Sequence, residues 1–526
     1  MFDRREFLKR SAVAASTLLA AGTAGGQTPK AVEIEEATVT SLQQAMASGR
    51  VTARQITQAY LARISRLDRR INSVIEINPD ALLIAARMDT ERRNGKVRGP
   101  LHGIPVIIKD NIDTSDKMKT TAGSLALLDI PTPKDAFIVA RLREAGAVLL
   151  GKTNLSEWAN FRDTGSISGW SGRGGQTRNP YILDRNPCGS SSGTGAAIAA
   201  NLAAVGIGTE TDGSIVCPSS ICGIVGLKPT VGLVSRSGII PISGSQDTAG
   251  PMTRSVSDAA IMLDILDEAD PTDRATISSG KRREKVSYTT ALIKDGLRGA
   301  RIGVARDYWG KRKEVDAVCD AALSTMKSRG AVLIDVKFPN LQKFGDAEFE
   351  VLLFEFKDGL NKYLAGRGSR YKTLDDLIRF NQQNAAKEMP YFGQAIFEMA
   401  AKKGSLESKE YRDALATSRK YTRDEGIDEA MDKQKLDAIV APSNAPTWLI
   451  DTVNGDCGSA YLGSSSIAAT AGYPSITVPA GFVSELPVGI SFFGRAWSEH
   501  TLIKLAYSFE QATNARRKPK FLSTYI

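Results

Sequence analysis

The stretch Ile104-Pro105-Val106-Ile107-Ile108 is a short apolar run, typical of a strand that is buried on both faces of a sheet. Two similar runs follow, Ala147-Val148-Leu149-Leu150 and Ala438-Ile439-Val440. Helix-prone stretches, including 135–145 and 195–202, lie between or beside such runs. Because strands that alternate with helices usually form a parallel sheet with helical connections, the sequence predicts an α/β fold with a substantially parallel sheet.

Around these runs, the sequence indicates further helices. Residues from about 340 to 435 are polar, helix-prone and poor in strand signals, which predicts a helical region where substrate specificity could be set. Thr40 and Thr52 each open a capping box with a glutamine three residues later, so each predicts a helix start. The 526 residues suggest about three domains or one large α/β unit.

The composition excludes several classes of protein. Hydrophobic residues make up 42% and charged residues 24%, which does not fit a disordered chain or a fibre. The five cysteines are too few for a disulfide scaffold. With only His102 and His500 present, neither a histidine metal centre nor a Ser-His-Asp triad is expected. The net charge is +10, but no dense basic run with interleaved aromatic residues occurs, so no nucleic-acid partner is predicted.

The N-terminus has the pattern of an export signal. Arg4 and Arg5 form a twin-arginine pair, and an Ala-rich, weakly apolar stretch follows from Ser11 to Ala21. This stretch is shorter than the roughly 18 residues needed to span a bilayer, so no membrane anchor is expected. We therefore predict a Tat signal over residues 1–24, with the Tat machinery as a partner and a periplasmic or secreted protein as the product.

One nucleotide-binding motif is rejected. Residues 146–153, Gly-Ala-Val-Leu-Leu-Gly-Lys-Thr, match the P-loop pattern. A P-loop needs a loop whose N–H groups face phosphate, whereas the Ala-Val-Leu-Leu residues here favour a buried strand. We predict a strand and no NTPase activity.

Two turns rich in small residues and one lysine are candidates for catalysis. Residues 187–197 are rich in Gly and Ser and lead into an apolar helix, although such a stretch can also be a flexible linker. Residues 208–215 form a second turn that could place Ser214 among free backbone N–H groups or be an ordinary surface turn. Lys109 ends the first apolar run. A lysine there usually reaches water, but a desolvated one can act as a base.

Together these residues resemble the amidase signature family. The likeness extends from about residue 40 to 510 and rests on motifs in a fixed order: Lys109 after 101–105, Ser190 and Ser191, Ser214 after Gly213, and the segments 226–230, 246–252 and 486–489. The resemblance implies one large amidase domain over residues 30–526. Its central sheet is expected to be mixed and mostly parallel, with helices covering both faces.

The resemblance also implies a Ser-Ser-Lys triad. Ser214 is then the nucleophile, Ser190 is the bridging serine on a cis peptide bond after Gly189, and neutral Lys109 is the base. Such a triad forms an acyl-enzyme and releases ammonia or an amine. It uses no metal or cofactor, which fits the scarcity of histidine.

Further roles follow from the same likeness. The backbone N–H groups of Thr211, Asp212 and Gly213 are expected to hold the oxyanion, and Ser191 is expected to contact substrate. Four positions depart from the commonest family pattern: Cys188 and Ser192 where glycines are usual, Asp212 in place of a glycine, and Val216 where arginine is frequent. These departures bear on substrate fit more than on the chemistry.

Three segments narrow the expected class of substrate. The sequence resembles the peptide amidase branch of the family, whose members remove the terminal amide from peptides, at residues 210–214, 354–357 and 360–361. Alternatives are an amidase of small aryl, aliphatic or fatty amides, and a non-catalytic binding protein on the same fold. A subunit that supplies ammonia for tRNA transamidation is disfavoured by the Tat signal, because that work is cytoplasmic.

Overall fold

The three apolar runs form strands of one 11-stranded sheet in the computed structural model, which describes residues 32–278, 287–457 and 463–525. The first run is β2 (Pro105–Lys109), the second lies in β3 (Val148–Thr153), and the third lies in β11 (Ala438–Pro442). Every residue of β3 is buried, so the segment that matches the P-loop pattern is a core strand, as predicted.

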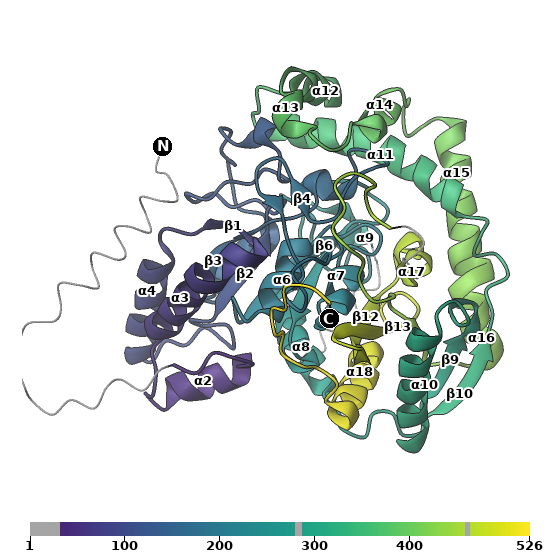
Figure 1. Cartoon of the computed structure of the whole chain (residues 1–526), viewed down its shortest axis with the longest axis horizontal. Coiled ribbons are helices and arrows are strands. Elements are labelled where there is room, and N and C mark those ends of the chain that lie inside the picture. The colour runs from purple at the N-terminus through teal and green to yellow at the C-terminus, as the bar shows by residue number, and fades with distance from the viewer. Residues whose placement is uncertain (1–31, 279–286, 458–462, 526) are drawn as a thin grey trace, which may run out of the picture. The chain divides into compact units, whose positions relative to one another are not determined.

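The main sheet has the strand order β1-β3-β2-β6-β8-β7-β12-β13-β11-β9-β10, and β4 and β5 form a separate pair. Figure 1 shows β1, β3 and β2 at one end of the main sheet and β9 and β10 at the other. Parallel pairings occur in two groups, β3-β2-β6 and β11-β9-β10. The pairings from β6 to β11, and that of β1 with β3, are antiparallel. The α/β class and the mixed sheet are therefore confirmed, although four of the ten pairings in the main sheet are parallel, fewer than the expected majority. The remaining strands are β1 (Val74–Ile77), β4 (Trp170–Ser171), β5 (Gly175–Gln176), β6 (Val205–Glu210), β7 (Val225–Lys228), β8 (Thr248–Thr253), β9 (Arg301–Ala305), β10 (Val332–Val336), β12 (Ser475–Val483) and β13 (Leu486–Phe493).

Both faces of the sheet centre are covered. All residues of β2, β6, β8 and β13 are buried. Since successive side chains of a strand point to opposite faces, this pattern requires packing on both sides. The covering helices include α3, α4, α6, α7, α8, α10 and α18, which contact these strands or their neighbours.

The helices before the helical region are α2 (Val39–Ala47), α3 (Ala53–Ile71), α4 (Ala81–Arg93), α5 (Phe137–Glu144), α6 (Ser192–Ala199), α7 (Val216–Ile221), α8 (Val256–Leu266), α9 (Arg274–Ser278) and α10 (Lys313–Ser328). The predicted helical region contains α11 (Gly345–Gly366), α12 (Leu374–Gln383), α13 (Ala385–Glu388), α14 (Ala395–Ala401), α15 (Lys409–Arg419) and α16 (Asp428–Gln434). In Figure 1 they follow one another in an arc from α12 and α13 at the top to α16 at the lower right, and α11 contacts α12, α14 and α15. Helices α17 (Ser465–Ala471) and α18 (Glu499–Thr513) follow.

One predicted helix start is confirmed and one is wrong. Thr52 caps α3 in a capping box with Gln55, as expected. Helix α2 begins two residues before the predicted site, because Thr38 is its N-cap and pairs reciprocally with Ser41. The earlier start places Val39 in the core, where its side chain is 1% exposed.

The described residues from Ile34 onward form a single compact unit. The predicted Tat signal at residues 1–24 lies outside the described residues. Among the helices that the structure does describe, none combines the length and the apolar character that a bilayer crossing requires.

Candidate active site

Lys109 is fully buried at the carboxyl end of β2. Strand β6 runs parallel to β2, with Ile207 in register with Ile108, so Thr209 lies beside the lysine. Lys109 Nζ is 2.9 Å from Thr209 Oγ1 and 3.2 Å from the Thr209 carbonyl oxygen. Burial lowers the pKa of Lys109 to about 7, although the negative charges of Asp247 and Glu210 oppose this shift. A substantial fraction of this lysine is therefore neutral near pH 7.

The two predicted serines continue from Lys109 in one hydrogen-bonded chain. Lys109 Nζ lies 2.7 Å from Ser190 Oγ, and Ser190 Oγ lies 3.0 Å from Ser214 Oγ. Ser190 follows a cis peptide bond after Gly189, as expected from the resemblance. Lys109 and Ser190 are fully buried, whereas Ser214 is 8% exposed. The structure thus brings together the three side chains named from the sequence, with Ser214 at the accessible end.

Residues 211–214, which we call the oxyanion turn, leave β6 with Gly213 in the left-handed region at a φ of +75°. Glycine adopts this conformation without steric cost. No hydrogen bond to another described residue uses the N–H groups of Asp212, Gly213 or Ser214. Such N–H groups can stabilise a developing oxyanion.

Glu210 holds the residues that follow the oxyanion turn. One oxygen of its carboxylate accepts hydrogen bonds from the N–H groups of Ile215 and Val216, at 2.7 and 2.9 Å. These groups open α7 and would otherwise lack partners within the helix. Burial raises the pKa of Glu210. The sequence analysis assigned Glu210 no structural role, because no local capping pattern links a glutamate to a helix that begins six residues later.

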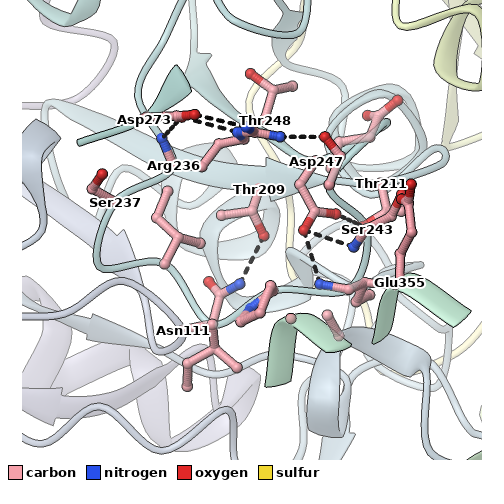
Figure 2. A pocket seen from close by; sticks show the side chains of 18 of the residues that line it. Asn111, Thr209, Thr211, Arg236, Ser237, Ser243, Asp247, Thr248, Asp273 and Glu355 are labelled. Carbon is pink, nitrogen blue, oxygen red and sulfur yellow. Dashed lines mark hydrogen bonds and ion pairs between the residues drawn. The ribbon is translucent and has the colours of Figure 1, made fainter. Parts of the chain in front are cut away.

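Asp247 holds the first residue of the oxyanion turn, Thr211 (Figure 2). Its carboxylate accepts hydrogen bonds from Thr211 Oγ1 at 2.6 Å and from the N–H groups of Ile242 and Ser243 at 2.8 and 2.9 Å. Burial raises the pKa of Asp247 to about 6. In the same view, Asn111 Nδ2 donates to Thr209 Oγ1 at 3.0 Å. Asp247 and Thr209 therefore hold the turn and the lysine in place.

Ser191 and Asp212 have contacts that the sequence did not predict. Ser191 is fully buried, and its hydroxyl donates to the Thr209 carbonyl and accepts from the Thr209 N–H, at 3.0 and 3.2 Å. Its hydroxyl thus faces β6, and the expected contact of Ser191 with substrate stays a prediction. The side chain of Asp212 accepts a hydrogen bond from Ser465 Oγ at 2.8 Å, and burial raises its pKa.

A disulfide bond joins Cys188 to Cys217. The sequence indicates Cys188 only as a departure from the family pattern and predicts no pairing. Five cysteines allow many pairings, and sequence alone does not select among them. The bond connects the segment before Ser190 to the first turn of α7, which follows Ser214.

Ser214 opens into a cleft of about 390 Å³. Its wall includes the oxyanion turn, the disulfide and apolar side chains from several segments: Phe161, Ile242, Leu352 and Trp448. The ionisable side chains Asp212 and Asp456 also line it, and no described Lys, Arg or His does. Among the residues that the structure places, no cluster of three or more His, Cys, Asp or Glu side chains is arranged to hold a metal ion.

Comparisons with known proteins agree with this geometry. The family model described as Amidase matches residues 55–503. A probable amidase of Arabidopsis thaliana is 42% identical over 500 residues, which is 93% of this chain and 92% of that protein. The native peptide amidase from Stenotrophomonas maltophilia has a crystal structure that is 50% identical and superposes with a TM-score of 0.88, covering 92% of this chain and 99% of that one. A peptide amidase in complex with the competitive inhibitor chymostatin is 51% identical over the same shares, with a TM-score of 0.90.

Proposed function

The chain belongs to the amidase family, and from this premise we propose that it hydrolyses the C-terminal carboxamide of short peptides through Ser214, Ser190 and Lys109. The observation that carries the proposal is the hydrogen-bonded chain from buried Lys109 to accessible Ser214, next to a turn with free N–H groups. These are the three parts that acyl transfer requires: a base, a nucleophile and an oxyanion site.

The contacts of Lys109 suit a base. A neutral amine has two N–H groups and one lone pair. If the two N–H groups donate to the two oxygens of Thr209, the lone pair points at Ser190 Oγ. The rotatable hydroxyls of Ser190 and Ser214 can then donate in one direction, from Ser214 to Ser190 and from Ser190 to Lys109. Thr209 is therefore a positioning residue for the base.

In the proposed reaction, Ser214 Oγ attacks the carboxamide carbon while its proton passes to Ser190 and the Ser190 proton passes to Lys109. The oxyanion is held by N–H groups of the oxyanion turn. Collapse of the tetrahedral intermediate breaks the C–N bond, and the proton returns through Ser190 to the leaving nitrogen, which departs as ammonia. Water then attacks the ester on Ser214, giving up a proton along the same route, and the carboxylic acid leaves.

The lining of the cleft supports a neutral amide as the substrate. Asp212 and Asp456 line the cleft, and no described cationic side chain on the lining can pair with a substrate carboxylate. A free peptide carboxylate would therefore be desolvated without a partner, whereas a neutral carboxamide carries no charge that needs one. Apolar side chains, including Leu352 from the helical region, can pack against the rest of a short peptide. This contact supports the predicted role of residues 340–435 in specificity, and likeness to peptide amidases supports the substrate class.

We also propose that the protein is exported through the Tat pathway, on the basis of Arg4, Arg5 and the Ala-rich stretch behind them. The Cys188–Cys217 disulfide supports an oxidising destination. A variant with Arg4→Lys and Arg5→Lys should keep the full-length protein in the cytoplasm and leave the periplasm without its amidase activity. Equal periplasmic activity in the variant and the wild type would contradict the proposal.

Ammonia release by the purified protein tests the catalytic proposal. The substrates are C-terminally amidated di- and tripeptides, a benzamide, a short aliphatic amide and a long-chain amide. We expect the peptide amides to react fastest, with Lys109→Ala and Ser214→Ala each lowering kcat by at least about 10³-fold. Ser324→Ala, on the exposed face of α10, is the matched control and should keep wild-type activity.

Each other outcome selects a different function. Release from the simple amides alone would keep the serine chemistry and replace the substrate class. Full activity in Ser214→Ala would refute the assignment of the nucleophile. A folded protein that releases no ammonia from any of these amides would favour the non-catalytic binding protein.

A further inference from the structure

The Cys188–Cys217 disulfide lies where the two serine segments meet. Cys188 is two residues before Ser190, and Cys217 is three residues after Ser214, with 6.1 Å between the two Cα atoms. Between residues 187–191 and 213–217, the described structure has two further direct links, which are hydrogen bonds. They join Ser190 Oγ to Ser214 Oγ, and the Ser191 N–H to the Ser214 carbonyl at 3.2 Å. The disulfide therefore links covalently the segment that carries Ser190 and the segment that carries Ser214.

The backbone at Cys188 indicates that its side chain is needed. Its φ is +59°, in the left-handed region that glycine adopts freely and other residues rarely adopt. Neighbouring side chains hold the residue in this conformation: Asn186 Oδ1 accepts from the Cys188 N–H at 2.8 Å, and Ser192 Oγ donates to the Cys188 carbonyl at 2.6 Å. A cysteine at a position that suits glycine is explained if the sulfur itself has a role.

The disulfide is also part of the cleft wall. Cys188 and Cys217 pack in one apolar cluster with Ile221 and Trp448, and the two cysteines and Trp448 line the cleft that contains Ser214. Both cysteines therefore border the substrate space, and each lies within three residues of one of the two serines.

We propose that Cys188 and Cys217 are positioning residues whose disulfide keeps Ser190 Oγ within hydrogen-bond distance of Ser214 Oγ, so that fast amide hydrolysis requires the oxidised enzyme. The inference rests on the proposed serine chemistry. Opening the bond needs a dithiol as reductant. The dithiol supplies two electrons and two protons, the S–S bond breaks, thiols form at Cys188 and Cys217, and the dithiol is oxidised to its own disulfide.

The first test compares kcat and KM for a C-terminally amidated dipeptide at 25 °C. The variant combines Cys188→Gly, which suits the positive φ, with Cys217→Ala. We expect kcat to fall about tenfold or more, with KM changed less than threefold, because small displacements of reacting groups are costly to rate. The matched control is Cys319→Ala, a buried thiol that packs in a separate apolar cluster with Val315 and Val488 and should keep the wild-type kcat.

Reduction of the folded wild-type protein provides a second test that needs no substitution. Dithiothreitol treatment, with thiol titration to show that the bond has opened, should lower kcat as in the variant, and reoxidation should restore it. If the disulfide serves stability alone, opening it will lower the melting temperature and leave kcat unchanged at 25 °C. If the disulfide only shapes the cleft, opening it will raise KM and leave kcat unchanged.

Either of these two results overturns the proposal. Failure of the serine mechanism is distinguishable from both. If the serine mechanism is wrong, either the wild-type protein hydrolyses no amide or the Ser214→Ala variant still hydrolyses amides. Both results would be the same with the disulfide closed or open.

Discussion

Removing the Thr209 hydroxyl should shift the pH dependence of hydrolysis. The change is Thr209→Val, which keeps the side-chain shape in β6 and removes the Oγ1 that lies 2.9 Å from Lys109 Nζ and 3.0 Å from Asn111 Nδ2. The pKa of Lys109 is about 7, and only the neutral amine accepts a proton from Ser190. Wild-type kcat/KM should therefore rise with pH through a midpoint near 7 and then level off.

The size of the shift follows from the lost hydrogen bond. Such a bond stabilises a charged donor by about 1.5–3 kcal/mol and a neutral donor by about 1 kcal/mol. The charged lysine in Thr209→Val thus loses roughly 0.5–2 kcal/mol more than the neutral lysine. Since one pKa unit corresponds to about 1.36 kcal/mol, the midpoint should move to lower pH by about half a unit to one and a half units.

The plateau should fall at the same time. With one acceptor lost, the amine no longer has two fixed N–H contacts and its lone pair is less often directed at Ser190, so we expect kcat to fall about tenfold. The assay is ammonia release from a peptide amide between pH 5 and 9. Thr209→Ser keeps a hydroxyl and should have the wild-type midpoint. A midpoint that stays near 7 in Thr209→Val, with an unchanged plateau, would refute the role of Thr209 in holding the base.

Three further predictions concern the groups around the two serines. Ser190→Ala should lower kcat by about 10² or more with little change in KM, because proton transfer loses its middle member; a kcat near that of the wild type would mean that Ser214 reaches the base without it. Glu210→Ala should lower the free energy of unfolding in urea by about 1–3 kcal/mol, whereas Glu210→Gln keeps the oxygen that caps α7 and should match the wild type. Loss of the Cys188–Cys217 disulfide, whose cysteines are 29 residues apart, should lower the free energy of unfolding by about 3–4 kcal/mol, as measured by urea denaturation of the oxidised and reduced protein.

The parts of the site that sequence could predict are those with local signals. Lys109 ends an apolar run, and Ser190 and Ser214 lie in turns of small residues, so each is a candidate from the sequence, and the resemblance to the amidase signature family implies its role. The same holds for β2 and β3, whose apolar residues predict buried strands. The antiparallel centre of the sheet had no comparable signal, because strand pairing depends on long-range contacts rather than on the residues of one strand.

The residues that sequence reasoning missed act through tertiary contacts. Thr209 looks like an ordinary strand threonine, and its hydroxyl gains a role because β6 lies in register beside β2. The Cys188–Cys217 pair needs the two turns to meet in space. Thr38 and Thr40 could each begin α2, and the difference is set by the burial of Val39 against the rest of the fold.

Burial alone does not identify the base in this protein. Lys152 and Lys228 are also fully buried, and burial lowers the pKa of each to about 8. Lys152 Nζ lies 2.8 Å from Thr120 Oγ1 and also donates to the Ile112 carbonyl, and Lys228 Nζ donates to the Pro229 carbonyl. The partners in these contacts, Thr120, Ile112 and Pro229, do not line the cleft. Lys109 has a comparable pKa, but its contact with Ser190 continues to Ser214 and so to the substrate space. In the proposed mechanism, a buried lysine with a lowered pKa acts as a base only if hydrogen bonds connect it to the nucleophile. Thr209 and the disulfide, which hold this chain of hydrogen bonds in place, are therefore as important for the reaction as burial.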